Sequence, residues 1–380
     1  MKQVTDDKGY KYSVKEEIGS DGQGKLYSTN NANVIIREAE GVDPKEYDNV
    51  KVLPISNIKK LILPDNYIGN SGYVLKIPES FVPLSNLMKH GAKDDFYIST
   101  GGLKRRLDIL AGIAQVLNEL HAIPVMYGSM APCRIFIDSD VSHNDAYLLY
   151  SKKMDFSMSF REETDEDPYI SPEAKKGMGS TLACDSYTFA ALASDLLTNY
   201  NTQIISPALN ELLNKAGREP GQRPAMLELH KTLLKELDLL IKCKKCMQDF
   251  YFETAKCPIC KAELPRLIKA SIYDESEGKI LDRGTKVWEF AVGIQSLYNY
   301  HTDNVLTGDT IESRIDCAIN VSRDRKVSFI IKNLMEKEIF VNKKPLPTRQ
   351  ATLIQLPCES IDISYPLFSS VKRCINLVMI

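Results

Sequence analysis

The sequence contains no apolar run of the roughly 18 to 20 residues that a membrane-spanning helix needs. Its first residues also lack the apolar core of a secretion signal. Neither sign of charge dominates, because 48 lysines and arginines stand against 50 aspartates and glutamates. This balance gives no overall attraction to nucleic acid or to an anionic membrane. We therefore expect a cytoplasmic protein without membrane contact, whose partners are selected by local surfaces and not by overall charge. Overall charge gives no support to nucleic-acid binding, which is kept as a third possibility through the cysteine-rich segment.

The sequence also lacks the cysteine and histidine patterns of several protein classes. The five histidines are scattered, without the spacing of a metal site or a catalytic triad. The nine cysteines are an odd number; four of them form two close pairs and five are scattered. This distribution fits a reducing compartment and a metal site better than a disulfide framework. With 380 residues, 43% of them hydrophobic, the chain is long enough for two or three globular cores.

The apolar periodicity changes near residue 80. Before it, brief apolar runs such as 34–36 alternate with turns and predict a small β-rich lobe, about residues 1–80. After it, apolar residues recur at helical spacing, as over 103–117, and predict a mainly helical lobe, about residues 81–240. A run of leucines over 227–240 extends the last predicted helix directly to the first close cysteine pair.

A glycine-rich segment, IGSDGQGKLY at 18–27, lies between two strand-like runs. Gly19, Gly22 and Gly24 are spaced so that backbone N–H groups can approach phosphate oxygens closely. The same pattern also suits a tight hairpin turn that needs glycine only for its backbone. The segments that follow favour the phosphate interpretation.

From this point the sequence resembles the protein kinase fold over roughly residues 8–240. Further motifs occur in the kinase order: the helix end Leu117–His121, the catalytic-type loop Tyr127–Ile137, Met154–Ser157 like Asp-Phe-Gly, Tyr169–Glu173 like Ala-Pro-Glu, the start of a central helix at Asp185, and Gln222–Pro224 with its arginine. The resemblance implies a two-lobed kinase-like domain over residues 1–240. It also implies ATP as a candidate ligand, with these candidate binding residues: Gly19, Gly22, Gly24, Arg37 and Asp155.

The resemblance implies two architectural contacts in the helical lobe. Glu173 and Arg223 should form a buried ion pair. Asp185 should accept hydrogen bonds from backbone N–H groups of the catalytic-type loop. His121 is expected to be a packed residue at the end of its helix and not a ligand.

Most side chains that phosphoryl transfer needs are absent. Kinases use a strand lysine for the phosphates, a loop aspartate for the hydroxyl proton, and an asparagine and an aspartate for magnesium. Three of these positions and the neighbouring loop lysine are replaced, by Arg37, Ser129, Arg134 and Ala131. The permanent charge of Arg134 repels a divalent cation, so magnesium binding is disfavoured. Only Asp155 is retained from the chemical set.

We therefore interpret the first two-thirds of the chain as a pseudokinase, a catalytically impaired kinase-like domain with a regulatory or scaffold role. The alternative is an active but atypical Ser/Thr protein kinase that uses ATP, in which Arg37, Asp155 or a carboxylate such as Asp138 takes over the missing duties. The helix glutamate that should pair with a strand lysine has Glu46 as its nearest candidate. That residue suits a solvated surface carboxylate as well.

Two close cysteine pairs predict a zinc ribbon over residues 241–265. The pattern is C-x2-C, ten residues, C-x2-C, formed by Cys243, Cys246, Cys257 and Cys260. Four thiolates complete a tetrahedral shell with no open position, so the expected Zn²⁺ is structural. The lysines beside these cysteines have two interpretations. They balance the negative charge of the four thiolates, or they favour binding of an acidic partner or nucleic acid. Charge balance is the simpler interpretation.

Short apolar segments separated by polar turns predict an all-β sandwich over residues 266–380. The segments 326–333, 338–346 and 360–363 resemble the last strands of a forkhead-associated domain. That family binds phosphothreonine, but the Gly-Arg and Ser-x-x-His pattern is absent and Asn342 is followed by lysine. We expect a β-sandwich that binds protein partners together with the ribbon, and Trp288 in its core.

Overall fold

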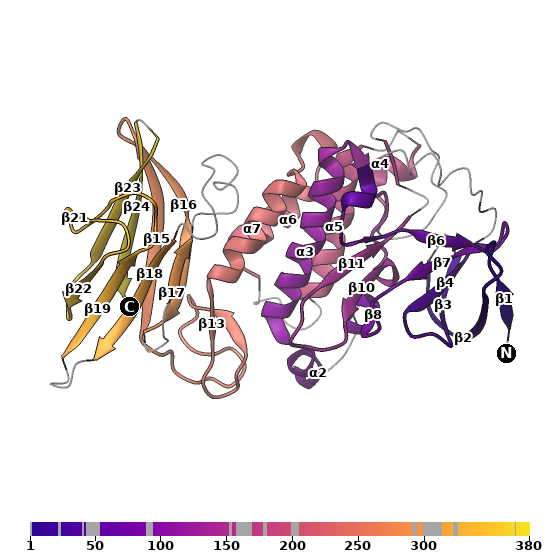
Figure 1. Cartoon of the computed structure of the whole chain (residues 1–380), viewed down its shortest axis with the longest axis horizontal. Coiled ribbons are helices and arrows are strands. Elements are labelled where there is room, and N and C mark those ends of the chain that lie inside the picture. The colour runs from indigo at the N-terminus through magenta and orange to yellow at the C-terminus, as the bar shows by residue number, and fades with distance from the viewer. Residues whose placement is uncertain are drawn as a thin grey trace. The chain divides into compact units, whose positions relative to one another are not determined.

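The computed structural model describes residues 2–21, 24–39, 42, 54–88, 94–151, 154–156, 169–177, 181–198, 205–290, 295–298, 314–321, 326–368 and 370–380. The chain divides into two compact units, Met1–Leu237 and Asp238–Ile380 (Figure 1). Within the described ranges, every α-helix begins in the first unit and the second is built from strands. No helix in these ranges combines the length and the apolar character that crossing a membrane requires.

The first unit begins with a six-stranded antiparallel sheet, drawn in indigo and violet in Figure 1. In spatial order its strands are β1 (Gln3–Thr5), β2 (Lys11–Asp21), β3 (Gly24–Thr29), β4 (Val34–Glu38), β7 (Gly72–Lys76) and β6 (Pro64–Tyr67). The apolar run 34–36 forms β4, which lies in the interior of the sheet and is buried. The prediction of short strands in this region is confirmed.

The rest of the first unit is mainly helical. Its helices are α2 (Asp94–Ser99), α3 (Gly102–Ala122), α4 (Pro172–Lys175), α5 (Leu182–Thr198), α6 (Pro207–Ala216) and α7 (Met226–Asp238). Helix α3 buries Leu103, Leu107 and Leu117, as the helical spacing predicts. Helix α6 begins at Ser206, whose side-chain oxygen accepts a hydrogen bond from the backbone N–H of Leu209 at 3.1 Å.

Short strands precede these helices or lie between α3 and α4. A four-stranded sheet has the order β5 (Leu61–Ile62), β11 (Ala146–Leu149), β10 (Ile135–Asp138) and β8 (Phe81–Pro83). A second pair joins β9 (Val125–Met126) to β12 (Asp155–Phe156). Strand β5 lies before residue 80 but pairs with β11, which lies after it. The four-stranded sheet therefore contains strands from both sides of the predicted lobe boundary.

The leucine run 227–240 does not form one helix up to Cys243. Helix α7 ends at Asp238, and Leu240 begins strand β13 (Leu240–Lys242), which pairs with β14 (Asp249–Tyr251). The backbone N–H of Phe252 also donates to the carbonyl of Leu239 at 3.1 Å. The helix ends because these residues pair with a strand that follows the first cysteine pair.

The second unit contains two sheets around one core. The first has the order β16 (Lys279–Glu289), β15 (Leu267–Ser276), β24 (Val371–Met379), β23 (Ile361–Phe368), β20 (Ile339–Val341) and β21 (Lys344–Leu346). The second has the order β17 (Gln295–Tyr298), β18 (Arg314–Val321), β19 (Val327–Asn333) and β22 (Ala351–Gln355). Residues of both sheets, including Ile272, Phe329 and Ile375, form one buried cluster.

Trp288 belongs to this cluster and is 7% exposed, which confirms its predicted core position. Along β15 the buried residues alternate with half-buried ones, so one face of the strand points to the core. A smaller cluster joins the cysteine-containing segment to β15 and β16 through Leu267 and Val287. The ribbon segment and the first hairpin of the β domain therefore share apolar contacts.

Candidate functional site

One carboxylate holds the catalytic-type loop in place. Asp185 lies in the first turn of α5 and is fully buried. It accepts hydrogen bonds from the backbone N–H groups of Tyr127, at 2.7 Å, and of Gly128, at 2.8 Å. Its Oδ2 also lies 2.9 Å from Nε2 of His121 near the end of α3. The predicted role of Asp185 is confirmed, and His121 is packed at its helix end.

The predicted ion pair between Glu173 and Arg223 is also present. Nη2 of Arg223 donates to Oε2 of Glu173 at 2.9 Å, and Nη1 donates to the other carboxylate oxygen. Burial alone would raise the pKa of Glu173, but hydrogen bonds from Arg223 and Cys184 outweigh it and lower the pKa from 4.5 to about 2. The guanidinium also lies over the ring of Tyr187.

The loop positions that the kinase resemblance assigns to catalysis are all in the interior. Ser129 is 0%, Ala131 6% and Arg134 1% exposed. The 3₁₀ helix η3 (Pro132–Arg134) directs Arg134 inward, where Nη1 donates to the side-chain oxygen of Ser151 at 3.0 Å. Ser129 therefore offers no accessible hydroxyl to a substrate, and the charge of Arg134 is held by neighbouring oxygens.

Arg37 lies on an inner strand of the first sheet. It lies on β4 opposite Leu26 of β3 and Tyr73 of β7, and it is 3% exposed. Paired residues of neighbouring strands point to the same face, so Leu26 and Arg37 share one side of the sheet. Leu26 is fully buried. The position that the resemblance assigns to the strand lysine is thus a buried cation beside a buried apolar side chain.

The glycine loop forms the hairpin between β2 and β3, and Asp21 pairs with Gly24. Gly22 lies outside the described residues, as does Glu46, and only the backbone of Asp155 is described. A Cβ added at Gly24 would lie 2.0 Å from the backbone oxygen of Glu38 on β4, so this glycine is needed for strand packing.

Gly19 packs against a residue that the sequence motifs did not single out. A Cβ at Gly19 would lie 2.7 Å from Cβ of Cys133 in η3. The thiol of Cys133 also donates to the backbone oxygen of Ser20 at an Sγ–O distance of 3.4 Å. We call these two interactions the closing contact. No motif indicates it, because the partners are 113 positions apart and the thiol is an ordinary small core side chain.

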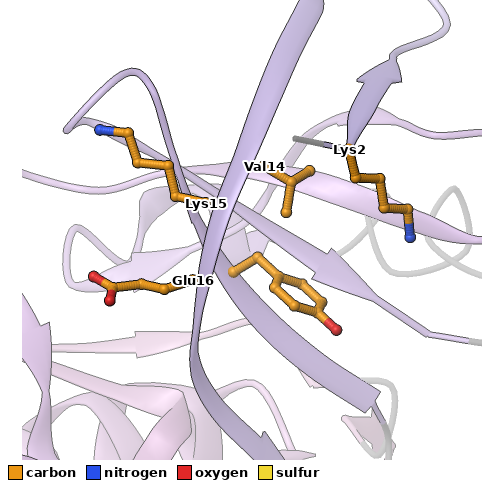
Figure 2. A pocket seen from close by; sticks show the side chains of 5 residues that line it. Lys2, Val14, Lys15 and Glu16 are labelled. Atoms are coloured by element: carbon orange, nitrogen blue, oxygen red, sulfur yellow. The ribbon is translucent and has the colours of Figure 1, made fainter.

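A cavity of about 520 Å³ lies elsewhere on the first sheet. Its lining residues are Lys2, Val14, Lys15, Glu16 and Tyr27. Tyr27 follows Leu26 in β3 and so points to the opposite face of the sheet from Leu26 and Arg37. The ammonium groups of Lys2 and Lys15 point away from each other in Figure 2. The cavity is therefore not the predicted nucleotide site, and its cations do not converge on one anion.

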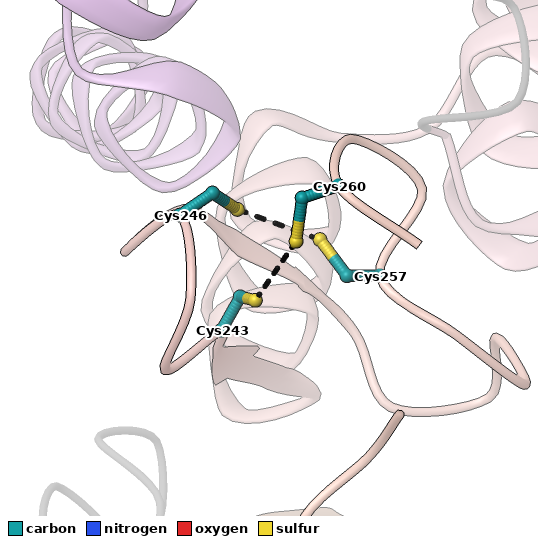
Figure 3. Close-up of side chains that lie close together, drawn as sticks. All are labelled: Cys243, Cys246, Cys257 and Cys260. Carbon is teal, nitrogen blue, oxygen red and sulfur yellow. Dashed lines mark hydrogen bonds between the residues drawn. The ribbon is translucent and has the colours of Figure 1, made fainter. Parts of the chain in front are cut away.

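The four paired cysteines converge on one point (Figure 3). Their sulfur atoms lie within 4.8 Å of one another, with Cys243 to Cys260 at 3.5 Å and Cys246 to Cys257 at 3.6 Å. Tetrahedral zinc with Zn–S bonds of about 2.3 Å places its sulfurs roughly 3.8 Å apart. Disulfides are much shorter, at about 2.0 Å. The four cysteines could therefore hold a metal ion such as zinc.

The two cysteine pairs have matching backbones. Met247 and Lys261, each directly after the second cysteine of its pair, have φ of 60° and 59°. Each of them donates its backbone N–H to the carbonyl of the first cysteine, at 2.8 and 2.9 Å. Backbone N–H groups also bond the sulfur of Cys243, and although burial alone would raise its pKa, these bonds lower it to about 7. Such turns aim both thiols of a pair at one ion.

Two of the lysines around the cysteines form ion pairs with carboxylates of the same unit. Lys244 pairs with Glu289, and Lys256 pairs with Glu263 at 2.6 Å. Lysines that are held by carboxylates within the same unit offer less charge to a phosphate backbone. These pairs agree with the simpler interpretation that the lysines balance local charge.

No protein-family model matches this sequence, and no curated protein does. Among solved structures, the chain is similar to the crystal structure of a Toxoplasma gondii specific rhoptry antigen kinase domain. The TM-score is 0.47 and the sequence identity 12%, over 62% of this chain and 85% of that chain. A likeness of this size decides neither an activity nor a ligand.

Proposed function

We propose that the first unit is a catalytically impaired kinase-like domain that serves as a regulatory or scaffold element. The observation that carries this proposal is the replacement and burial of the catalytic positions, above all Arg134. Its guanidinium is buried, and the kinase resemblance assigns this position to the asparagine that holds magnesium. The ion pair of Glu173 with Arg223 and the carboxylate of Asp185 support a kinase-like architecture.

Calorimetric titration of the full chain with ATP, in magnesium and again in EDTA, tests this proposal. We expect no binding that depends on magnesium and no transfer of radiolabelled phosphate to a generic acceptor protein. Magnesium-dependent binding together with phosphate transfer that Asp155→Ala abolishes would overturn it in favour of an atypical Ser/Thr kinase. Binding that ignores magnesium would instead support a pseudokinase that senses nucleotide.

We further propose that Cys243, Cys246, Cys257 and Cys260 hold one structural Zn²⁺. With four thiolates and no open position, the ion would cross-link the two turns and supply no catalysis. Metal analysis of the purified chain should give one zinc per molecule, and Cys257→Ser should lose it. Cys358→Ser is the matched control, because Cys358 is half-buried and lies outside the cluster. Equal zinc content in both variants would contradict the assignment.

We also propose that the second unit binds protein partners through its β-sandwich and ribbon. This binding does not depend on phosphothreonine in the partner. Asn342 lies in the turn between β20 and β21, where it and Lys343 have positive φ. Its side-chain oxygen accepts the backbone N–H of Asp362 at 2.9 Å, so the side chain supports the hairpin. Peptides with and without phosphothreonine should bind equally in fluorescence anisotropy; a clear preference for the phosphorylated peptide would revive a forkhead-associated function.

A further inference from the structure

The closing contact joins the two segments that enclose the phosphates of ATP in kinases. Gly19 and Ser20 lie near the end of β2, which continues to Asp21, and Cys133 lies in η3 of the catalytic-type loop, one residue before Arg134. The Cα of Gly19 is so close to Cys133 that no side chain fits between them. A phosphate bound by backbone N–H groups lies with its oxygens about 2.9 Å from each donor nitrogen. The gap between the two segments must therefore hold this distance and the phosphate itself. A phosphate cannot lie between segments that already touch.

Packing alone explains why two positions of the loop are glycine, without any ligand. A side chain at position 19 would clash with Cys133, and a side chain at position 24 would clash with the backbone of β4. Cys133 is 6% exposed, so the thiol is enclosed by the protein in this arrangement. Cores and interfaces tend to occupy discrete arrangements and do not deform continuously, so this contact is either made or broken.

We propose that the closing contact is an autoinhibitory device that holds Gly19 and Ser20 on the catalytic-type loop and closes the nucleotide position. Breaking it would let these two residues move away from Cys133 and admit the phosphates of a nucleotide. The inference rests on the proposed function only in taking that position from the kinase resemblance. It requires neither catalysis nor magnesium.

A double-mutant cycle on the full chain measures the contact itself. Gly19→Ala introduces the methyl group that meets Cys133, so it should lower the midpoint of thermal unfolding. In the Cys133→Gly background the same change should lower the midpoint much less, because the opposing Cβ is gone. Equal effects of Gly19→Ala in both backgrounds would overturn the contact.

Nucleotide binding measures what the contact does. ATP in EDTA should bind Cys133→Gly about tenfold more tightly than the unaltered chain, because a ligand binds more weakly when its competent state is rarely populated. Cys133→Ser is the matched control, since it keeps Cβ and a hydrogen-bond donor, and it should behave like the unaltered chain. If Cys133→Gly does not fold, Cys133→Ala removes the thiol alone and should change affinity in the same direction.

The autoinhibitory role would be overturned if the unaltered chain and the Cys133 variants bind ATP with the same affinity, or if none of them binds ATP. This failure is distinct from that of the proposed function. Phosphate transfer by the unaltered chain would disprove catalytic impairment, whereas the double-mutant cycle reports on the closing contact regardless of catalysis.

Discussion

At the scale of single residues, two carboxylates stabilise the helical lobe. Asp185 accepts two backbone N–H groups of the catalytic-type loop, and Glu173 binds Arg223 through two parallel hydrogen bonds. Both are largely buried, where a charged hydrogen bond is stronger than at the surface. They hold the catalytic-type loop and helix α4 in place.

Replacing Glu173 by glutamine should destabilise the first unit by about 2 kcal/mol at pH 7, because hydrogen bonds between charged groups are lost. The pKa of Glu173 is lowered from 4.5 to about 2, so its contribution is complete above pH 4.5 and declines as the pH falls toward 2. Urea unfolding at pH 7 and pH 3 should show the difference between variant and unaltered chain shrinking at the lower pH. Glu17→Gln, which removes the exposed pair with Lys25, should change little at either pH.

At the scale of elements, a buried ion pair joins two strands of the β domain. Arg373 of β24 lies opposite Asp274 of β15, with Nε to Oδ1 at 2.8 Å and exposures of 1% and 2%. The sequence patterns did not indicate this pair, because its members are 99 positions apart. The next residues on the same strands, Glu275 and Lys372, form a pair at 3.1 Å that is exposed to solvent.

These two neighbouring pairs allow a controlled comparison. Arg373→Leu should destabilise the second unit by about 3–5 kcal/mol, because it leaves Asp274 as a buried charge without its cation. Lys372→Leu changes a pair on the same two strands but at the surface, and its effect should be under about 1 kcal/mol. Denaturant unfolding followed by circular dichroism measures both. Similar losses for the two variants would show that burial does not govern the contribution of Arg373.

The elements that the sequence predicted are those with a local signal. The helical spacing of α3 and the strand β4 follow from apolar periodicity. The contacts of Glu173 and Asp185 join distant positions and were expected only because the kinase resemblance implies them. The end of α7 at Asp238 could not be predicted, since leucine spacing continues to 240 and only the pairing of β13 with β14 stops the helix. The closing contact at Cys133 depends on tertiary structure alone.

At the scale of the whole molecule, each of the two units has its own buried core. Units with separate cores can unfold as separate cooperative transitions. Scanning calorimetry of the full chain should therefore resolve two transitions. Glu173→Gln should lower the midpoint of one, and Cys257→Ser or removal of metal by a chelator should lower the other. A single transition that every variant shifts would contradict this division.

The small core that the cysteine segment shares with Val287 has a consequence for self-association. Strand β16, which carries Val287, is an edge strand of its sheet, and β13 of the cysteine segment lies against it. If the ribbon loosens when metal is scarce, this edge is uncovered and offers unpaired backbone groups to other chains. If the proposed Zn²⁺ holds the ribbon in place, its supply would then control association of the molecules through this edge.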